Sequence, residues 1–253
     1  KKRDRLLVTL FLLTSMVFLS AVFAVQGSLL SAMIDAYQLD AARQGLANTL
    51  AFAGGVLALI CAFLVQGRWR KRTLLKAAVL ICAAGLVLMW LAPGYGLYTA
   101  AWFVTGFGLG LMDTLLSACM ADLYTGRQAV TMMCVLHTAY GLSSVFSPMG
   151  YAALLSAGLP WKRIYPVIAA AGGLLLLGAW LVRSLCRIED NEPLCPKTAD
   201  LGRILPALRE GRLLWLVAAI FFHGIFLSGL NTWINRYADT LPCSHQLPAQ
   251  SCV

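Results

Sequence analysis

The sequence predicts an all-α integral membrane protein built as a bundle of spanning helices. Of its 253 residues, 60% are hydrophobic and only 12% are charged, and the mean hydropathy is +0.76. A soluble domain needs more polar residues than this to cover its core with polar surface. The apolar residues also gather into stretches of about 20, each long enough to cross about 30 Å of hydrocarbon.

Seven such stretches follow one another along the chain. They must be helices, because lipid offers no partners for backbone N–H and C=O groups and the alternating pattern of barrel strands is absent. The first stretch could instead be a signal peptide, but it is longer than a typical signal core and six further spans follow it. The predicted spans are 6–30, 46–66, 73–92, 97–121, 129–156, 163–183 and 213–235.

The spacing of the spans divides the chain into three parts. Residues 1–183 form a six-span bundle, residues 184–212 form a linker of mixed charge, and residues 213–253 hold the seventh span and the start of a second domain. Because the chain begins without Met and stops soon after the seventh span, we expect it to be a fragment of a longer protein.

The distribution of lysine and arginine sets the orientation. With a cytoplasmic N-terminus, 16 of these residues fall in inside segments and only 4 in outside segments, which is a clear positive-inside bias. The net charge of +9 is therefore topological, and no nucleic-acid partner is implied. We expect a multi-pass protein of the cell (cytoplasmic or inner) membrane, in contact with the lipid bilayer.

The sequence offers no sign of a cofactor, a metal site or an enzyme. Most of the eight cysteines lie in spans or in the linker, and no Cys or His spacing resembles a zinc site. Gly106, Gly108 and Gly110 lie inside a span without a preceding strand, so they predict close helix packing and no nucleotide loop. Cys243 and Cys252 follow the seventh span on the outside and could form a disulfide.

Spans 1 and 4 share a short sequence match. GSLLSAMIDAY at 27–37 is similar to DTLLSACMADLY at 113–124, and AGLVLMWL in span 3 is echoed by GGLLLLGAWL in span 6. Many transporters are built from three-helix units related by inversion. We therefore expect two inverted three-helix repeats, in which Gly27 corresponds to Asp113.

With six spans, a cytoplasmic linker and the start of another helix, the whole chain resembles the major facilitator superfamily. GLGLMDT at 108–114 and LHTAYGLSSVFSP at 136–148 are most similar to the sugar-transporting branch that includes the fucose:proton symporters. The resemblance implies twelve spans in two halves, a small solute, protons and a monomer when the protein is full length. Asp113 matches the coupling carboxylate of that branch, but Ser117 replaces an expected Asn and Gly27 an expected Asp.

The loop between spans 2 and 3 is a second point of resemblance. QGRWRKR supplies a basic gating loop of Arg68, Arg70, Lys71 and Arg72. Gly67 stands where the superfamily normally has Asp, so the resemblance leaves the gating salt bridges built on that Asp without their acid.

Two ionisable residues are predicted to carry proton coupling. Asp113 lies nine residues before the predicted inside end of span 4, about 13 Å into the membrane. An ionised Asp costs roughly 2.5–3.5 kcal/mol at such depth, so we expect it to face a cavity where it takes and releases protons. The alternative is a protonated packing residue. His137 on span 5 is either a proton relay or a neutral packing histidine.

The predicted substrate contacts are polar and aromatic residues within the spans, because transporter sites near the midplane use a few such groups. They are Gln26, Asn48, Tyr140, His223, Asn231 and Trp233.

Taken together, these features predict a secondary active transporter of a small polar solute. The expected solute is a sugar, moved by alternating access with proton coupling. The alternatives are an efflux antiporter of the same superfamily for a drug or metabolite, and a membrane sensor or scaffold that transports nothing.

Overall fold

The computed structural model describes two long segments and a set of residues near the C-terminus. The described residues are 2–65, 69–181, 214–215, 218–219, 221–222, 224–226, 229–230, 233–234 and 237. The predicted linker, 184–212, and both cysteines of the suggested disulfide lie outside them.

Every regular element in the two long segments is helical, which confirms the all-α fold class. Six of the helices in this part of the chain are long and apolar enough to cross a membrane, and their ends lie within four residues of the predicted ends. The elements are α1 (Lys2–Ser28), α2 (Leu30–Tyr37), α3 (Ala41–Val65), α4 (Lys71–Leu91), α5 (Tyr95–Leu123), α6 (Gly126–Ser156), η1 (Trp161–Arg163) and α7 (Ile164–Leu181).

The first span extends further than its predicted end, because α2 continues the direction of α1. The break falls at Leu29, yet Leu29 N–H donates to Val25 O at 3.0 Å and Met33 N–H donates to Leu29 O at 2.9 Å. These two bonds join Leu29 to both helices, although the turn at Leu29 separates α1 from α2. Helix α2 ends at Gln38, whose own N–H bonds to Ile34 O and whose left-handed backbone (φ 49°) lets the next N–H, of Leu39, bond to the same carbonyl at 3.2 Å.

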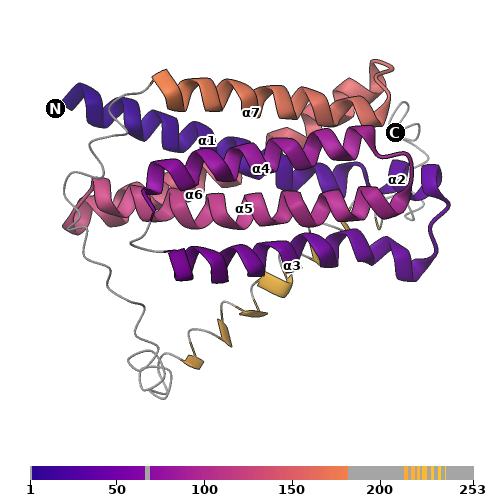
Figure 1. Cartoon of the computed structure of the whole chain (residues 1–253), viewed down its shortest axis with the longest axis horizontal. Helices are drawn as coiled ribbons and strands as arrows, with labels where there is room; N and C mark the ends of the chain where they lie inside the picture. Colours follow the sequence, from indigo (N-terminus) through magenta and orange to yellow (C-terminus); the bar gives the residue numbers. More distant parts are fainter. Residues whose placement is uncertain are drawn as a thin grey trace.

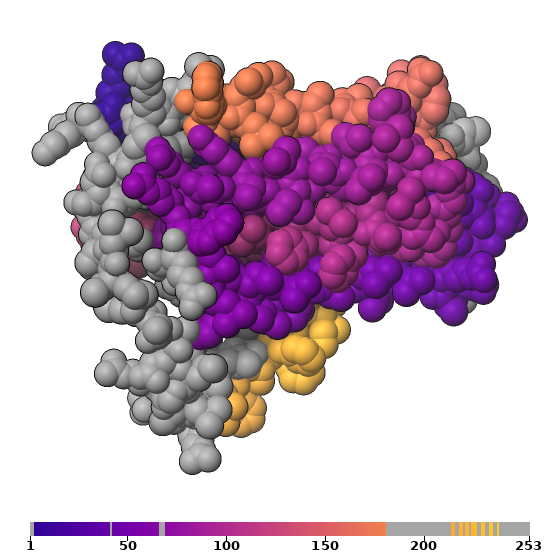
Figure 2. All heavy atoms as spheres, viewed as in Figure 1, coloured from indigo at the N-terminus to yellow at the C-terminus, as the bar shows by residue number. Residues whose placement is uncertain are grey.

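The long helices lie side by side, with α5 at the centre of the bundle (Figure 1). Helix α5 packs against α3, α4, α1 and α6, while α1 also packs on α6 and α4 on α7. In Figure 2, atoms of α4 and α5 fill the middle of one face, with α7 along one edge and α3 along the other. In the predicted repeat, the first three spans (α1, α3, α4) correspond in order to the second three (α5, α6, α7). The α3–α5 pair then corresponds to the α6–α1 pair, and both pairs are in contact, as expected for such a repeat.

Helices α3 and α5 approach each other through glycine. A Cβ atom added to Gly106 would collide with the Ala51 carbonyl, and one added to Gly110 would lie 2.8 Å from Gly55 Cα. A Cβ on Gly54 would collide with the Phe103 carbonyl. These glycines allow the two backbones to touch, which is how many membrane helices associate.

Helices α1 and α6 are joined by hydrogen bonds instead. Ser20 Oγ donates to Tyr140 O at 2.9 Å, Ser143 Oγ donates to Val17 O at 2.8 Å, and Tyr151 Oη donates to Ala21 O at 2.7 Å. Each bond gives a buried or half-buried hydroxyl a backbone partner on the facing helix, which lipid could not provide.

Aromatic side chains close the end of the bundle that our orientation places outside. Tyr98 and Tyr165 are fully buried, and their hydroxyls lie 2.6 Å apart. Lys162 Nζ donates to Ala92 O at 2.9 Å and lies 5.2 Å from the ring centre of Tyr37. This cluster ties the start of α7 to the ends of α2 and α4.

Candidate functional site

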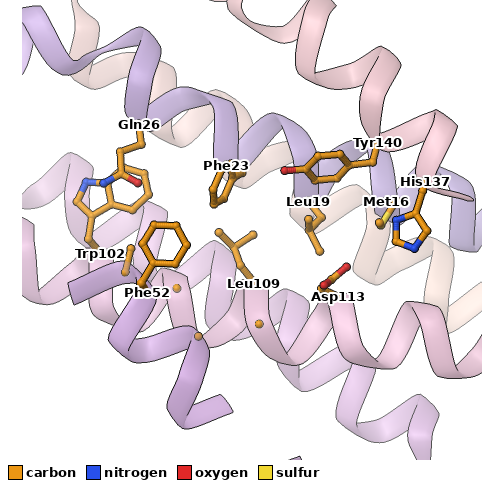
Figure 3. Close-up of a pocket in the computed structure, with 14 residues that line it drawn as sticks. Met16, Leu19, Phe23, Gln26, Phe52, Trp102, Leu109, Asp113, His137 and Tyr140 are labelled. Atoms are coloured by element: carbon orange, nitrogen blue, oxygen red, sulfur yellow. The ribbon is translucent and has the colours of Figure 1, made fainter. Parts of the chain in front are cut away.

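A cavity of about 550 Å³ opens between α1, α3, α5 and α6 (Figure 3). Helices α1 and α6 form one wall and α3 and α5 the other, so the cavity separates the two pairs described above. The residues that line it are Met16, Leu19, Phe23, Gln26, Ala51, Phe52, Gly55, Trp102, Gly106, Leu109, Gly110, Asp113, His137 and Tyr140.

The contribution of α5 is a single stripe that ends at Asp113. Trp102, Gly106, Leu109 and Asp113 are three or four residues apart, so they lie on one face of the helix. Asp113 lies ten residues before the end of α5, about 15 Å along the helix, which places it within the hydrocarbon depth. Its side chain is exposed, and it opens into the cavity.

Helix α6 brings the other two members of the acidic end of the cavity. His137 and Tyr140 are three residues apart and therefore share a face of α6. Figure 3 shows the His137 ring and the Asp113 carboxylate pointing toward each other from opposite walls, with the Tyr140 ring alongside. The bond from Ser20 to the Tyr140 carbonyl fixes this part of α6 against α1.

Helix α1 contributes Gln26 at the opposite end of the cavity. Its amide extends toward Trp102, which is almost fully buried, while Phe23 lies between Gln26 and the acidic end (Figure 3). The Phe23 ring meets the Phe52 ring of α3 edge to face, with centres 6.1 Å apart. This end of the cavity is therefore aromatic.

The structure brings some of the predicted substrate contacts to the cavity and leaves others away from it. Gln26 and Tyr140 line it, whereas Asn48 lies on α3 about one turn before Phe52 and is not among the lining residues. Trp233 is 37% exposed and does not line it either. Two further predicted contacts, His223 and Asn231, lie outside the described residues.

The predicted gating loop forms an ion pair with the end of α5. Lys71, the first residue of α4, places Nζ 2.6 Å from Asp122 Oδ2, and both side chains are partly buried. Arg70 immediately precedes the helix and Arg72 follows Lys71, whereas Arg68 lies outside the described residues. Asp122 therefore supplies a carboxylate from the neighbouring helix to one of the four predicted gating residues.

Sequence analysis missed the aromatic lining, although a helical signal was present. Phe23 is three residues before Gln26, and Trp102 is eleven residues before Asp113, which is about three helical turns. Stepping by three or four from each predicted residue would have found both. Phe52 lies four residues after the predicted Asn48, so the same step reaches it, but nothing in the sequence of α3 shows which of its faces turns toward α1.

The chemistry available in the cavity is proton exchange and solute contact. Asp113 and His137 are the ionisable lining residues besides the phenol of Tyr140. Within the described ranges, no three His, Cys, Asp or Glu residues are grouped so that they could hold a metal ion. Cys61, Cys82, Cys119 and Cys134 are not joined in disulfides.

Comparison with known proteins finds similarity over most of the chain. A family model described as Major Facilitator Superfamily matches residues 10–250. Protein TsgA homolog of Erwinia tasmaniensis is 25% identical over 245 residues, which are 93% of this chain and 58% of the relative. Protein TsgA of Salmonella arizonae is 22% identical over 244 residues, which are 95% of this chain and 60% of the relative.

A solved structure is also similar in fold. A crystal structure of a mutant of the peptide transporter POT in complex with sulfate matches with a TM-score of 0.60 and 15% identity. The match covers 88% of this chain and 46% of that one. The chain thus spans about six-tenths of the length of the curated relatives above and forms a bundle like part of a larger transporter.

Proposed function

The chain belongs to the major facilitator superfamily, and on that premise we propose that its cavity is the solute site of a proton-coupled secondary transporter. The observation that carries the proposal is the Asp113 carboxylate, which faces His137 inside a cavity between four spans. The full-length protein would work as a monomer in the cytoplasmic membrane, with its N-terminus inside.

The position of Asp113 supports a role in coupling. Ionisable residues at this depth are rare, turn toward a bundle interior or an aqueous passage, and commonly serve in proton relays. Asp113 is exposed to the cavity, so water or a solute can reach it. A carboxylate that gains and loses its proton as the cavity opens to alternate sides couples proton movement to solute movement.

The role of His137 follows from its place beside that carboxylate. Histidine changes charge near neutral pH more readily than any other side chain. With its ring directed at Asp113 from α6, it can pass a proton to or from the carboxylate. We therefore assign His137 to the proton path and Asp113 to the coupling step itself.

The sequence resemblance adds a sugar as the solute, and two features of the cavity suit one. Phe52 offers a flat ring face, and Gln26 offers an amide that both donates and accepts hydrogen bonds. The ion pair between Lys71 and Asp122 would close the inside end of the passage in one state and break in another.

The test replaces Asp113 by Asn in protein expressed from its complete gene and reconstituted in liposomes. We expect proton-driven accumulation to disappear, because the amide cannot carry the proton, while counterflow of a neutral solute continues. Asp35→Asn is the matched control, since Asp35 is exposed near the end of α2 and does not line the cavity. Accumulation that survives in the Asp113→Asn variant would refute the assignment. The control should accumulate solute like the native protein.

A further inference from the structure

Glycines line the wall of the cavity that faces α1, where α3 meets α5. Gly55, Gly106 and Gly110 all line the cavity, and these three residues form what we call the glycine floor. The floor is flat because the two backbones touch, as the 2.8 Å approach that a Cβ on Gly110 would make to Gly55 Cα shows. A flat ring can rest on such a surface, because no side chain rises from it into the cavity.

The rings of the cavity lie around this floor. Phe52 comes from α3, and Phe23 and Tyr140 come from the opposite wall (Figure 3). Aromatic side chains prefer offset or edge contacts with other rings, and Phe23 and Phe52 already meet at an interplanar angle of 76°. A planar solute between Phe23 and the floor would complete such an arrangement.

The charged groups that line the cavity favour a cationic solute over an anionic one. Its described lining residues include the carboxylate of Asp113 and no lysine or arginine. Among the described lining residues, only the His137 ring could carry a positive charge toward an anionic solute, whereas a cation would find both a carboxylate and aromatic faces, which attract cations. The polar groups also lie apart, because Gln26 is at the Trp102 end and Asp113 is about 16 Å away along α5.

We propose that the solute is an organic cation with a flat ring, whose ring rests on the glycine floor and whose amine binds Asp113. The inference rests on the proposed function, because it takes the cavity to be the transport site, and it replaces the sugar implied by the sequence resemblance. It also fixes the direction of coupling. One carboxylate cannot hold a proton and pair with an ammonium at once, so the two are exchanged across the membrane.

The proposal is tested by direct binding of three probes of nearly equal size. Phenethylamine carries the cation, 2-phenylethanol is its neutral counterpart, and 3-phenylpropanoate is the anion. Titration calorimetry on protein expressed from the complete gene should show the amine binding about tenfold more tightly than the alcohol, and the anion most weakly. Asp113→Asn should reduce the preference for the amine to about twofold or less, whereas Asp35→Asn should leave it unchanged.

The floor is tested separately with Gly55→Ala. A Cβ at this position would meet Gly106 O at 3.6 Å, an ordinary contact, so the helices can keep their packing while the floor loses its flatness. We expect all ring probes to bind several-fold more weakly, and Gly141→Ala, where a Cβ meets nothing within 4 Å, to have no such effect.

The outcomes separate this inference from the function on which it rests. Equal binding of amine and alcohol, no binding of the amine at millimolar concentration, or tighter binding of a sugar would overturn the cation, while proton coupling through Asp113 would stand. If the native protein prefers the amine but shows no proton coupling through Asp113, the proposed function would be overturned and the cation would stand. Retention of the full amine preference in Asp113→Asn would overturn the contact with Asp113.

Discussion

The α3–α5 interface and the α1–α6 interface occupy equivalent places in the inverted repeat, yet they are built in different ways. In the first, Gly106 and Gly110 bring two backbones into contact. In the second, the hydroxyls of Ser20, Ser143 and Tyr151 bond to carbonyls of the facing helix. Both interfaces border the cavity, one as its floor and the other as the wall opposite.

The difference shows two ways of solving the same problem in lipid. Hydrocarbon gives no hydrophobic gain for helix association, so helices must gain contact energy or hydrogen bonds from each other. A close backbone contact does not tolerate an added methyl group, because that group separates the helices along several turns. Hydrogen bonds can be lost one at a time. The floor should therefore behave as a rigid unit, and the opposite wall should weaken in small steps.

The largest effect should come from adding a methyl group to the rigid interface. In Gly106→Ala the new Cβ would collide with the Ala51 carbonyl and lie 2.7 Å from Ala51 Cα, so α3 must move. Overpacking of this kind costs typically about 1–3 kcal/mol. The free energy of unfolding in mixed micelles of detergent and lipid should therefore fall by about 1–3 kcal/mol.

Gly141→Ala provides the matched control for this first prediction. Gly141 is exposed on α6, and a Cβ there would meet nothing within 4 Å. Alanine is the better helix former, by about 0.5–1 kcal/mol in water, so no loss of stability is expected. Equal losses in the two variants would mean that glycine matters for the helices themselves and not for their contact.

The α3–α5 interface was partly predictable from the sequence, and the reason is chemical. Glycines spaced along an apolar span, such as Gly106 and Gly110, have few explanations other than close packing. The sequence does not say which helix they touch. That partner depends on how six spans arrange in space, and the facing residues Ala51 and Gly55 are unremarkable in an alanine-rich span.

A smaller effect is expected at the hydrogen-bonded interface. Tyr151→Phe removes the hydroxyl that donates to Ala21 O at 2.7 Å but keeps the buried ring. Such bonds between membrane helices average about 0.6 kcal/mol and reach about 1.7. The free energy of unfolding should fall within this range, and below the loss in Gly106→Ala.

Ser156→Ala serves as the comparison for that hydroxyl, because Ser156 Oγ donates within its own helix, to Ala153 O, and is exposed. Its removal should change stability by less than about 0.5 kcal/mol. A loss in Tyr151→Phe as large as that in Gly106→Ala would erase the distinction between the two interfaces.

The candidate site shows a similar boundary between what a sequence reveals and what it conceals. Asp113 was found because a carboxylate in an apolar span is costly and needs a reason. Gln26 and Tyr140 were found as polar groups within apolar spans. Phe52 was not, because an aromatic residue in a membrane span is ordinary, and only the approach of α1 to α3 makes it part of a cavity.

The smallest change in stability is predicted for Gly55→Ala, and it divides the glycine interface into two kinds of position. A Cβ on Gly55 would lie 3.6 Å from Gly106 O, a normal van der Waals distance, although Gly55 lies opposite the closely packed Gly110. The new Cβ displaces nothing and alanine is the better helix former, so the free energy of unfolding should stay within about 0.5 kcal/mol of the native value.

This small effect matters because Gly55 also belongs to the cavity floor. If stability holds while ring binding weakens, the glycine is required by the solute and not by the helices. A loss of 1 kcal/mol or more, measured by the same unfolding titration, would show instead that the whole α3–α5 seam needs glycine for packing, about as strictly as at Gly106. The glycine floor would then be required for α3 to pack on α5, and its fit to a ring would be a consequence of that packing.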